Sequence, residues 1–118
     1  MRPSLSKNQL GAEGAQNLAE FLPVLPSLTE LNLYGNEVKD EGVTVICEAV
    51  QSNKETKLAS LNVGINKIGP AGAKSVAAMA AVIASLTRLD VRYHALGEEG
   101  EAALRKAIEG RSGFELLL

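Results

Sequence analysis

The feature that most constrains this chain is a repeated pattern of leucines. Segments 28–38, 58–68 and 86–96 all fit L-x-x-L-x-L-x-x-N-x-L when valine and isoleucine are counted with leucine. The one departure is His94, which stands where the other two copies have asparagine. Self-similarity at a fixed period is typical of solenoids, in which each unit buries its apolar layer against its neighbours. The chain is therefore predicted to be an array of similar units.

The residues after each leucine segment repeat as well. A glycine stands four residues after the last aliphatic residue of each copy. Apolar residues recur four, seven and eight positions after that glycine. Positions with this spacing share one face of an α-helix. A degraded leucine segment at 5–10 and a truncated one from Phe114 flank the three full copies. The repeated glycines are Gly14, Gly42, Gly72 and Gly100.

These patterns predict one α/β domain over residues 1–118, built from about four repeats. The repeats run approximately over 3–30, 31–60, 61–88 and 89–118. Strands are expected at 31–33, 61–63 and 89–91, and helices at 13–22, 41–51, 71–83 and 98–109. The polar stretch 51–57 lengthens one unit at a point between helix and strand, where an insertion enlarges a surface loop.

Each residue type in the pattern has a mechanical role. In L-x-L the two aliphatic side chains point inward from a short strand, while the residues between them point outward. The asparagine can bond backbone groups of its own loop and of the neighbouring loop. Acids such as Asp40 and Glu98 lie at helix starts, where they favour the helix dipole. The repeated glycine is expected to let each helix lie close to the strand layer.

The full pattern, L-x-x-L-x-L-x-x-N-x-[LVI]-[GK]-x-x-G followed by an amphipathic helix, resembles the ribonuclease-inhibitor type of leucine-rich repeat. That type also occurs in Ran GTPase-activating proteins and in the sensor domains of NOD-like receptors. The resemblance covers the chain from about Leu5 to Leu118. It implies a horseshoe segment with a parallel sheet on the concave face and helices on the convex face. It also implies protein binding on the concave face and its rims, but it transfers no catalytic residue.

Composition and charge exclude several classes of function. The net charge is −2 and no basic stripe is present, so nucleic-acid binding is not expected. One cysteine, no apolar signal segment and no long apolar stretch indicate a cytoplasmic protein without membrane spans. The acids at the helix starts belong to different helices, and the Gly-x-x-Gly elements lack the Lys-Ser/Thr of a phosphate loop. We expect neither a metal nor another cofactor.

The outward strand positions form the best candidate binding surface. Tyrosine and arginine are over-represented among interface hot spots, and this surface concentrates both near its C-terminal end. An alternative is a solvated face with no particular use. Ser60 and Gly64 also occupy outward positions. The residues predicted to contact a partner protein are Glu30, Asn32, Tyr34, Asn62, Arg88, Asp90, Arg92 and Tyr93.

Two further residues invite chemical interpretations that the pattern does not favour. His94 is the only histidine and lies on an open strand–loop position, without the cleft and partner that a catalytic histidine needs. It is interpreted as a divergent member of the asparagine row. Cys47 lies at the border of a helix's apolar face and is interpreted as a buried, inert side chain.

The favoured function is a protein–protein interaction scaffold or a fragment of one. The alternative is a regulator of a GTPase, in which Arg88 or Arg92 would contact that GTPase, although nothing around them marks an arginine finger. A repeat segment with no binding role is a third possibility. No catalytic constellation is present, so an enzyme is not expected.

The C-terminal residues 114–118 begin a strand with no further unit after it in the sequence. Either Phe114 and Leu117 fold back as a cap, or this edge pairs with a second copy of the chain. The hypothesis favoured by the sequence is self-association through the C-terminal edge.

Overall fold

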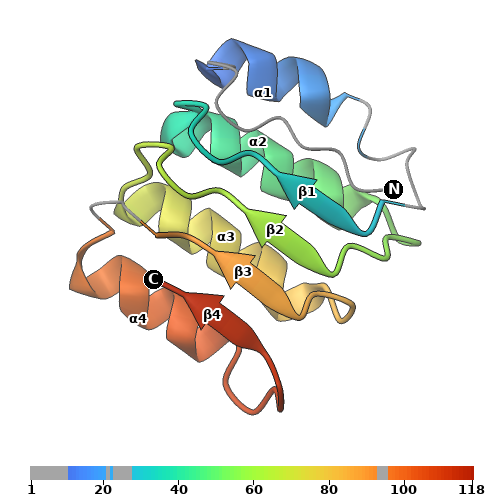
Figure 1. Cartoon of the computed structure of the whole chain (residues 1–118), viewed down its shortest axis with the longest axis vertical. Helices are drawn as coiled ribbons and strands as arrows, with labels where there is room; N and C mark the ends of the chain where they lie inside the picture. Colours follow the sequence, from blue (N-terminus) through green and yellow to red (C-terminus); the bar gives the residue numbers. More distant parts are fainter. Residues whose placement is uncertain (1–10, 21, 23–27, 93–95) are drawn as a thin grey trace.

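The computed structural model describes residues 11–20, 22, 28–92 and 96–118. Figure 1 shows the strands side by side, with the helices behind them. Helices and strands alternate along the chain in the order α1 (Gly11–Ala19), β1 (Glu30–Asn32), α2 (Lys39–Ser52), β2 (Ser60–Asn62), α3 (Pro70–Val82), β3 (Arg88–Asp90), α4 (Gly97–Ala107) and β4 (Glu115–Leu117).

The strands form one parallel sheet in the order β1-β2-β3-β4. The three consensus leucines Leu31, Leu61 and Leu89 are direct partners across it. The predicted alternation of elements and the parallel pairing are therefore confirmed. Each strand begins one residue earlier than predicted, but the ladder continues past its end, because Leu33 N–H donates to the Asn62 carbonyl at 2.7 Å.

The core lies between the sheet and the helices, as the repeated apolar positions predict. The central leucines of β1, β2 and β3 are buried, and so are Ile46, Val76 and Leu104, four positions after their glycines. Leu18, at the same position of the first helix, is partly buried. Cys47 lies in the same core, and burial raises the pKa of its thiol to about 12. The prediction that this cysteine is buried is confirmed, and a raised pKa disfavours the thiolate on which reactivity depends.

The buried Asn66 joins two consecutive loops. Asn66 Oδ1 accepts hydrogen bonds from the N–H groups of Asn36 (2.9 Å) and Val38 (3.2 Å) of the preceding repeat. Its Nδ2 donates to the carbonyls of Leu33 (2.7 Å) and Gly64 (3.0 Å). The predicted role, bonding its own and the neighbouring loop, is confirmed for Asn66. Asn36 Nδ2 donates to the Leu33 carbonyl of its own loop at 3.0 Å. His94, the third position in this row, lies outside the described residues.

The acids lie in the first turns of α2 and α4 as predicted, and one of them also contacts the next repeat. Asp40 lies in the first turn of α2, but its Oδ1 accepts hydrogen bonds from Gly69 N–H (2.6 Å) and Gly72 N–H (3.0 Å) at the start of α3. A Cβ on Gly72 would collide with Asp40 and would lie 3.0 Å from Val43 Cγ1 of α2. The glycine therefore allows close approach between neighbouring helices, and the expected approach to the strand layer is not its main contact.

The far ends of the helices are also joined between repeats. Ser85 Oγ donates to the Leu58 carbonyl at 2.8 Å. The Arg111 guanidinium donates to the carbonyls of Ala80 (2.6 Å) and Ile83 (2.7 Å) at the end of α3, where carbonyls lack a partner within the helix. Side chains of one repeat therefore satisfy backbone groups of the repeat before it.

The C-terminal residues do not fold back over the sheet. β4 extends it in register, with Leu116 opposite Leu89 and Leu117 opposite Asp90. Phe114 is partly buried, and the guanidinium carbon of Arg111 lies over its ring, 5.4 Å from the ring centre. Self-association through β4 remains a prediction. Within the described ranges, no helix has both the length and the apolar character that a bilayer span needs.

Candidate functional site

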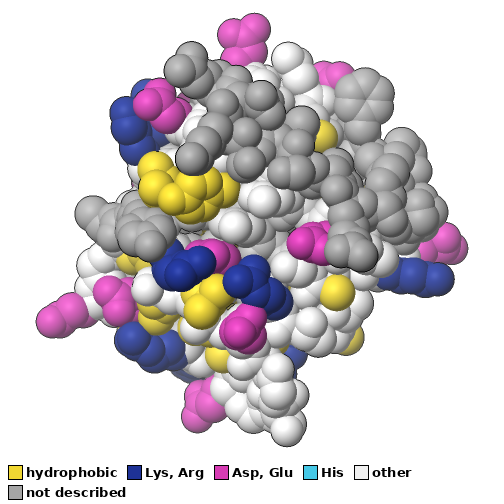
Figure 2. Space-filling view, in the orientation of Figure 1, with side chains coloured by type: hydrophobic (Ala, Val, Ile, Leu, Met, Phe, Trp, Pro, Cys, Tyr) yellow, Lys and Arg dark blue, Asp and Glu magenta, His cyan; other side chains and the backbone are white. Residues whose placement is uncertain are grey.

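The side of the sheet that faces away from the helices is turned toward the viewer in Figure 2, where charged side chains of both signs and a hydrophobic patch can be seen. We call this side the exposed sheet face. Because the strands are parallel and in register, its side chains form rows that cross the repeats. The first row is Glu30, Ser60, Arg88 and Glu115; the second is Asn32, Asn62, Asp90 and Leu117; the third is Tyr34, Gly64 and Arg92.

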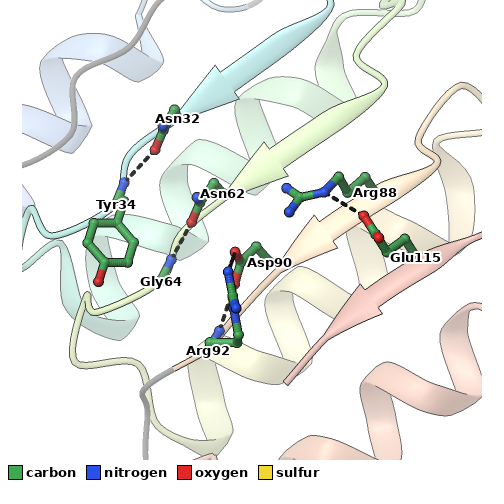
Figure 3. Close-up of polar contacts among 8 residues, drawn as sticks. All are labelled: Asn32, Tyr34, Asn62, Gly64, Arg88, Asp90, Arg92 and Glu115. Carbon is green, nitrogen blue, oxygen red and sulfur yellow. Dashed lines mark hydrogen bonds and ion pairs between the residues drawn. The ribbon is translucent and has the colours of Figure 1, made fainter.

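The second row is fixed by a contact that each repeat reproduces. Asn32 Oδ1 accepts from Tyr34 N–H at 3.0 Å, and Asn62 Oδ1 accepts from Gly64 N–H at 2.9 Å. Asp90 Oδ1 accepts from Arg92 N–H at 3.1 Å. Figure 3 shows these three contacts one behind another on neighbouring strands. This local contact to the residue two positions on holds each side chain in one orientation.

Tyr34 lies across the neighbouring repeat. A Cβ at Gly64 would lie 2.9 Å from Tyr34 Cδ2 and 3.3 Å from Asn62 Oδ1, so no larger residue fits beneath the ring. Tyr34 is half-buried and Gly64 is buried. The hydrophobic patch near the ends of β1 and β2 in Figure 2 lies in this region. The sequence placed Gly64 on the surface, but only the structure explains why a glycine suits this position.

Asp90 and Arg92 act as one unit. The carboxylate accepts from Arg92 Nε at 3.0 Å and from Nη2 at 2.8 Å, in addition to the backbone contact. Burial raises the pKa of Asp90, but the hydrogen bonds from Arg92 and the charges of Arg92 and Arg88 outweigh it, so the net pKa is lowered. Asp90 is 1% exposed, whereas the Arg92 side chain is 42% exposed. Asp90 therefore contributes to the surface mainly by holding Arg92.

Arg88 and Glu115 form the corresponding pair in the first row. Arg88 Nε donates to Glu115 Oε1 at 2.6 Å, and both side chains are exposed. Glu30 is half-buried at the other end of this row. The predicted surface thus holds charges of both signs, paired across or along the strands. Tyr93, the remaining predicted contact residue, lies outside the described residues.

Ile65, at the rim of the exposed sheet face, was not among the residues predicted to contact a partner. Its backbone has φ +48°, in the left-handed region, and its side chain is 42% exposed. A β-branched residue is strained in this region, and burial does not compensate the strain here. The preceding repeat has Gly35 at the matching position, with φ +73°. Comparing the two repeats at this position would have been the available signal.

A separate groove of about 490 Å³ lies where α2 and α3 end, lined in part by Asn53, Lys54, Val82 and Ser85. Val82 is 66% exposed there. Asn53 and Ser85 are engaged with backbone carbonyls of preceding repeats. Two of the polar side chains that line the groove are therefore used to join the repeats.

Comparison with known proteins identifies the repeats. A family model described as a leucine-rich repeat matches residues 4–19, 24–47 and 54–77, which is more than half of the chain. The chain belongs to the leucine-rich repeat family.

Three curated relatives show which proteins the sequence is similar to. The chain is 34% identical to mouse NACHT, LRR and PYD domains-containing protein 12 over 77% of its own length and 8% of that protein. It is 33% identical to mouse ribonuclease inhibitor over 82% of its length and 21% of that protein. It is 28% identical to RAN GTPase-activating protein 2 of Arabidopsis thaliana over 86% of its length and 18% of that protein. The chain thus spans about a fifth or less of each relative, and the resemblance to the ribonuclease-inhibitor type is confirmed.

Proposed function

We propose that this leucine-rich repeat segment binds a partner protein on the exposed sheet face. Leucine-rich repeats serve as protein-interaction scaffolds, and the names of two relatives, an inhibitor of ribonuclease and an activator of a GTPase, describe action on other proteins. The observation that carries the proposal is the fixed arrangement of Tyr34 over Gly64 beside the Arg92–Asp90 pair. Side chains held in place before binding lose little conformational entropy when a partner arrives.

The chemistry of the face suits a protein interface. Tyr34 and Ile65 supply apolar area, and the two paired arginines supply polar contacts around it. Interfaces combine apolar anchors with polar surroundings in this way, and tyrosine and arginine are enriched at their energetic centres. No single residue of the face resembles a catalytic group.

The experiment is an affinity capture from cell extract with three versions of the chain. Proteins retained by the wild type should be lost with the double variant Tyr34→Ala, Arg92→Ala. They should be retained with the control variant Val82→Ser. This variant changes an exposed apolar residue of the groove between α2 and α3, away from the exposed sheet face. Capture that survives the double variant, or that fails equally with Val82→Ser, would reject the exposed sheet face as the binding surface.

The alternative function is regulation of a GTPase. Both candidate arginines are already engaged by carboxylates, Arg88 by Glu115 and Arg92 by Asp90, so neither is presented as an arginine finger. A turnover assay with candidate GTPases separates the two functions. Acceleration that is lost with Arg88→Ala or Arg92→Ala would favour the GTPase-regulating function over simple binding.

A further inference from the structure

Some hydrogen-bond donors on the exposed sheet face have no acceptor among the residues that the structure describes. In Asn32 and Asn62 the side-chain oxygen is taken by a backbone N–H, so the planar amide is fixed and its Nδ2 is the remaining branch. Within the described part of the chain, neither Nδ2 has an acceptor. The two amides are direct neighbours across β1 and β2.

Arg88 adds a charged donor to these amides. Its Nε is bound to Glu115, while its two terminal nitrogens donate to no residue that the structure describes. Figure 3 shows the guanidinium pointing from β3 toward Asn62 on β2. We call Asn32, Asn62 and Arg88 the donor cluster.

Two of the nearby carboxylates, Asp90 and Glu115, are already engaged by arginines. Asp90 accepts three hydrogen bonds from Arg92 and is buried. Glu115 already faces Arg88 Nε from the far side. Within the described residues, the Asn62 amide and the terminal nitrogens of Arg88 therefore keep donors that Asp90 and Glu115 do not occupy, and the Arg88 donors carry a positive charge.

We infer that the donor cluster receives an aspartate or glutamate side chain of the partner protein. The inference rests on the proposed function and specifies the partner's chemistry at one point of the interface. A carboxylate offers two oxygens to donors from different directions, and hydrogen bonds between charged groups are shorter and stronger than neutral ones. The planar fork of an arginine matches a carboxylate in particular.

The test uses a random peptide library displayed on phage and selected against the immobilised chain. Peptides that bind should share an acidic residue, and replacing it by its amide should weaken binding at least about tenfold. Asn62→Ser keeps an oxygen for the Gly64 N–H but removes the amide donor, so affinity should fall severalfold. Asn62→Asp should lower it further, and it reproduces the residue that the next repeat has as Asp90.

Two more variants test whether the donor cluster or the overall charge of the chain controls peptide binding. Glu115→Gln removes the competing carboxylate while keeping an oxygen for Arg88, so it should tighten peptide binding about threefold. Ala78→Glu makes the same charge change as Asn62→Asp on an exposed position of α3, and it should leave affinity unchanged. An equal loss with Ala78→Glu would mean that overall charge, and not the donor cluster, controls binding, and would overturn the inference.

The possible failures are distinguishable. Peptides that lose affinity with Tyr34→Ala but carry no required acidic residue, or tolerate Asn62→Asp, would overturn the inference and leave the proposed function standing. Peptides that tolerate every substitution on the exposed sheet face would count against both. A selection that yields no binder would overturn the inference as well, because a pre-formed carboxylate site should enrich acidic peptides.

Discussion

In each of the two central repeats, two asparagines lie four residues apart in different environments. Asn36 and Asn66 are fully buried and saturated with backbone hydrogen bonds. Asn32 and Asn62 lie on the exposed sheet face and use only their oxygen, in a contact to their own strand end. The same residue type therefore stabilises the array in one row and offers unused donors in the other. Stability and recognition are assigned to separate rows of one repeat.

The largest expected effect comes from the buried row. Asn66→Ala removes the partners of four backbone groups in two loops, and unpaired buried polar groups cost about 1–3 kcal/mol each before relaxation and water entry. We expect a loss of about 3 kcal/mol in the free energy of unfolding. Asn62→Ala should cost less than about 1 kcal/mol, because water can reach its single contact. Urea melts of both variants measure the difference, and equal losses would contradict the division between the rows.

The next effect tests the core against the loops. Ile46→Ala and Val76→Ala should each cost about 1–4 kcal/mol, because both side chains are fully buried between a helix and the sheet. Glu37→Ala and Lys67→Ala should each cost less than about 0.5 kcal/mol. These two form an exposed ion pair at 3.4 Å, which solvent screens. Chemical denaturation ranks the four variants, and similar losses at all four would refute the assigned register.

Most of the fold could be predicted because its causes are local and repeated. The leucine spacing and the helical face determine which residues of each unit are buried, and Leu31, Leu61 and Leu89 align as a consequence. Contacts that cross between units could not be predicted in this way. Asp40 lies in the first turn of its own helix, as the pattern predicts, but its hydrogen bonds to Gly69 and Gly72 of the next unit could not be predicted.

The candidate site was predictable as a set of positions but not as an arrangement. Alternation along the strands indicates which residues face outward, and Glu30, Asn32, Tyr34 and Arg88 do so. It does not indicate that Arg92 covers Asp90, or that Tyr34 rests on Gly64. Both depend on side-chain directions between rows, which a one-dimensional pattern does not contain.

A smaller effect concerns pH and the one carboxylate in the exposed row. Because the folded-state pKa of Asp90 is lowered, its ionic contribution is present above the ordinary aspartate pKa and is lost as pH falls through the lower, folded-state value. Asp90→Asn should therefore cost on the order of 1 kcal/mol at neutral pH, and this cost should shrink in acid. Urea melts between neutral and acidic pH measure it. A cost that stays constant with pH would mean that the Asp90–Arg92 pair acts through shape and not through charge.

The smallest effect lies at the residue that separates the two rows. Gly35 and Ile65 both occupy the left-handed region, where the chain turns from the exposed asparagine toward the buried one. For an L-residue this conformation costs about 1–2 kcal/mol, whereas glycine costs about 0.4–1 kcal/mol through the entropy of the unfolded chain. Ile65→Gly should therefore raise stability by at most about 1 kcal/mol, and Gly35→Ala should lower it by a similar amount. Ile65→Gly should also weaken partner binding, because it removes an exposed apolar side chain next to Tyr34 on the rim of the face. If thermal melts show that Ile65→Gly destabilises the chain, the isoleucine is not strained there, and its left-handed backbone offers no argument for a role in recognition.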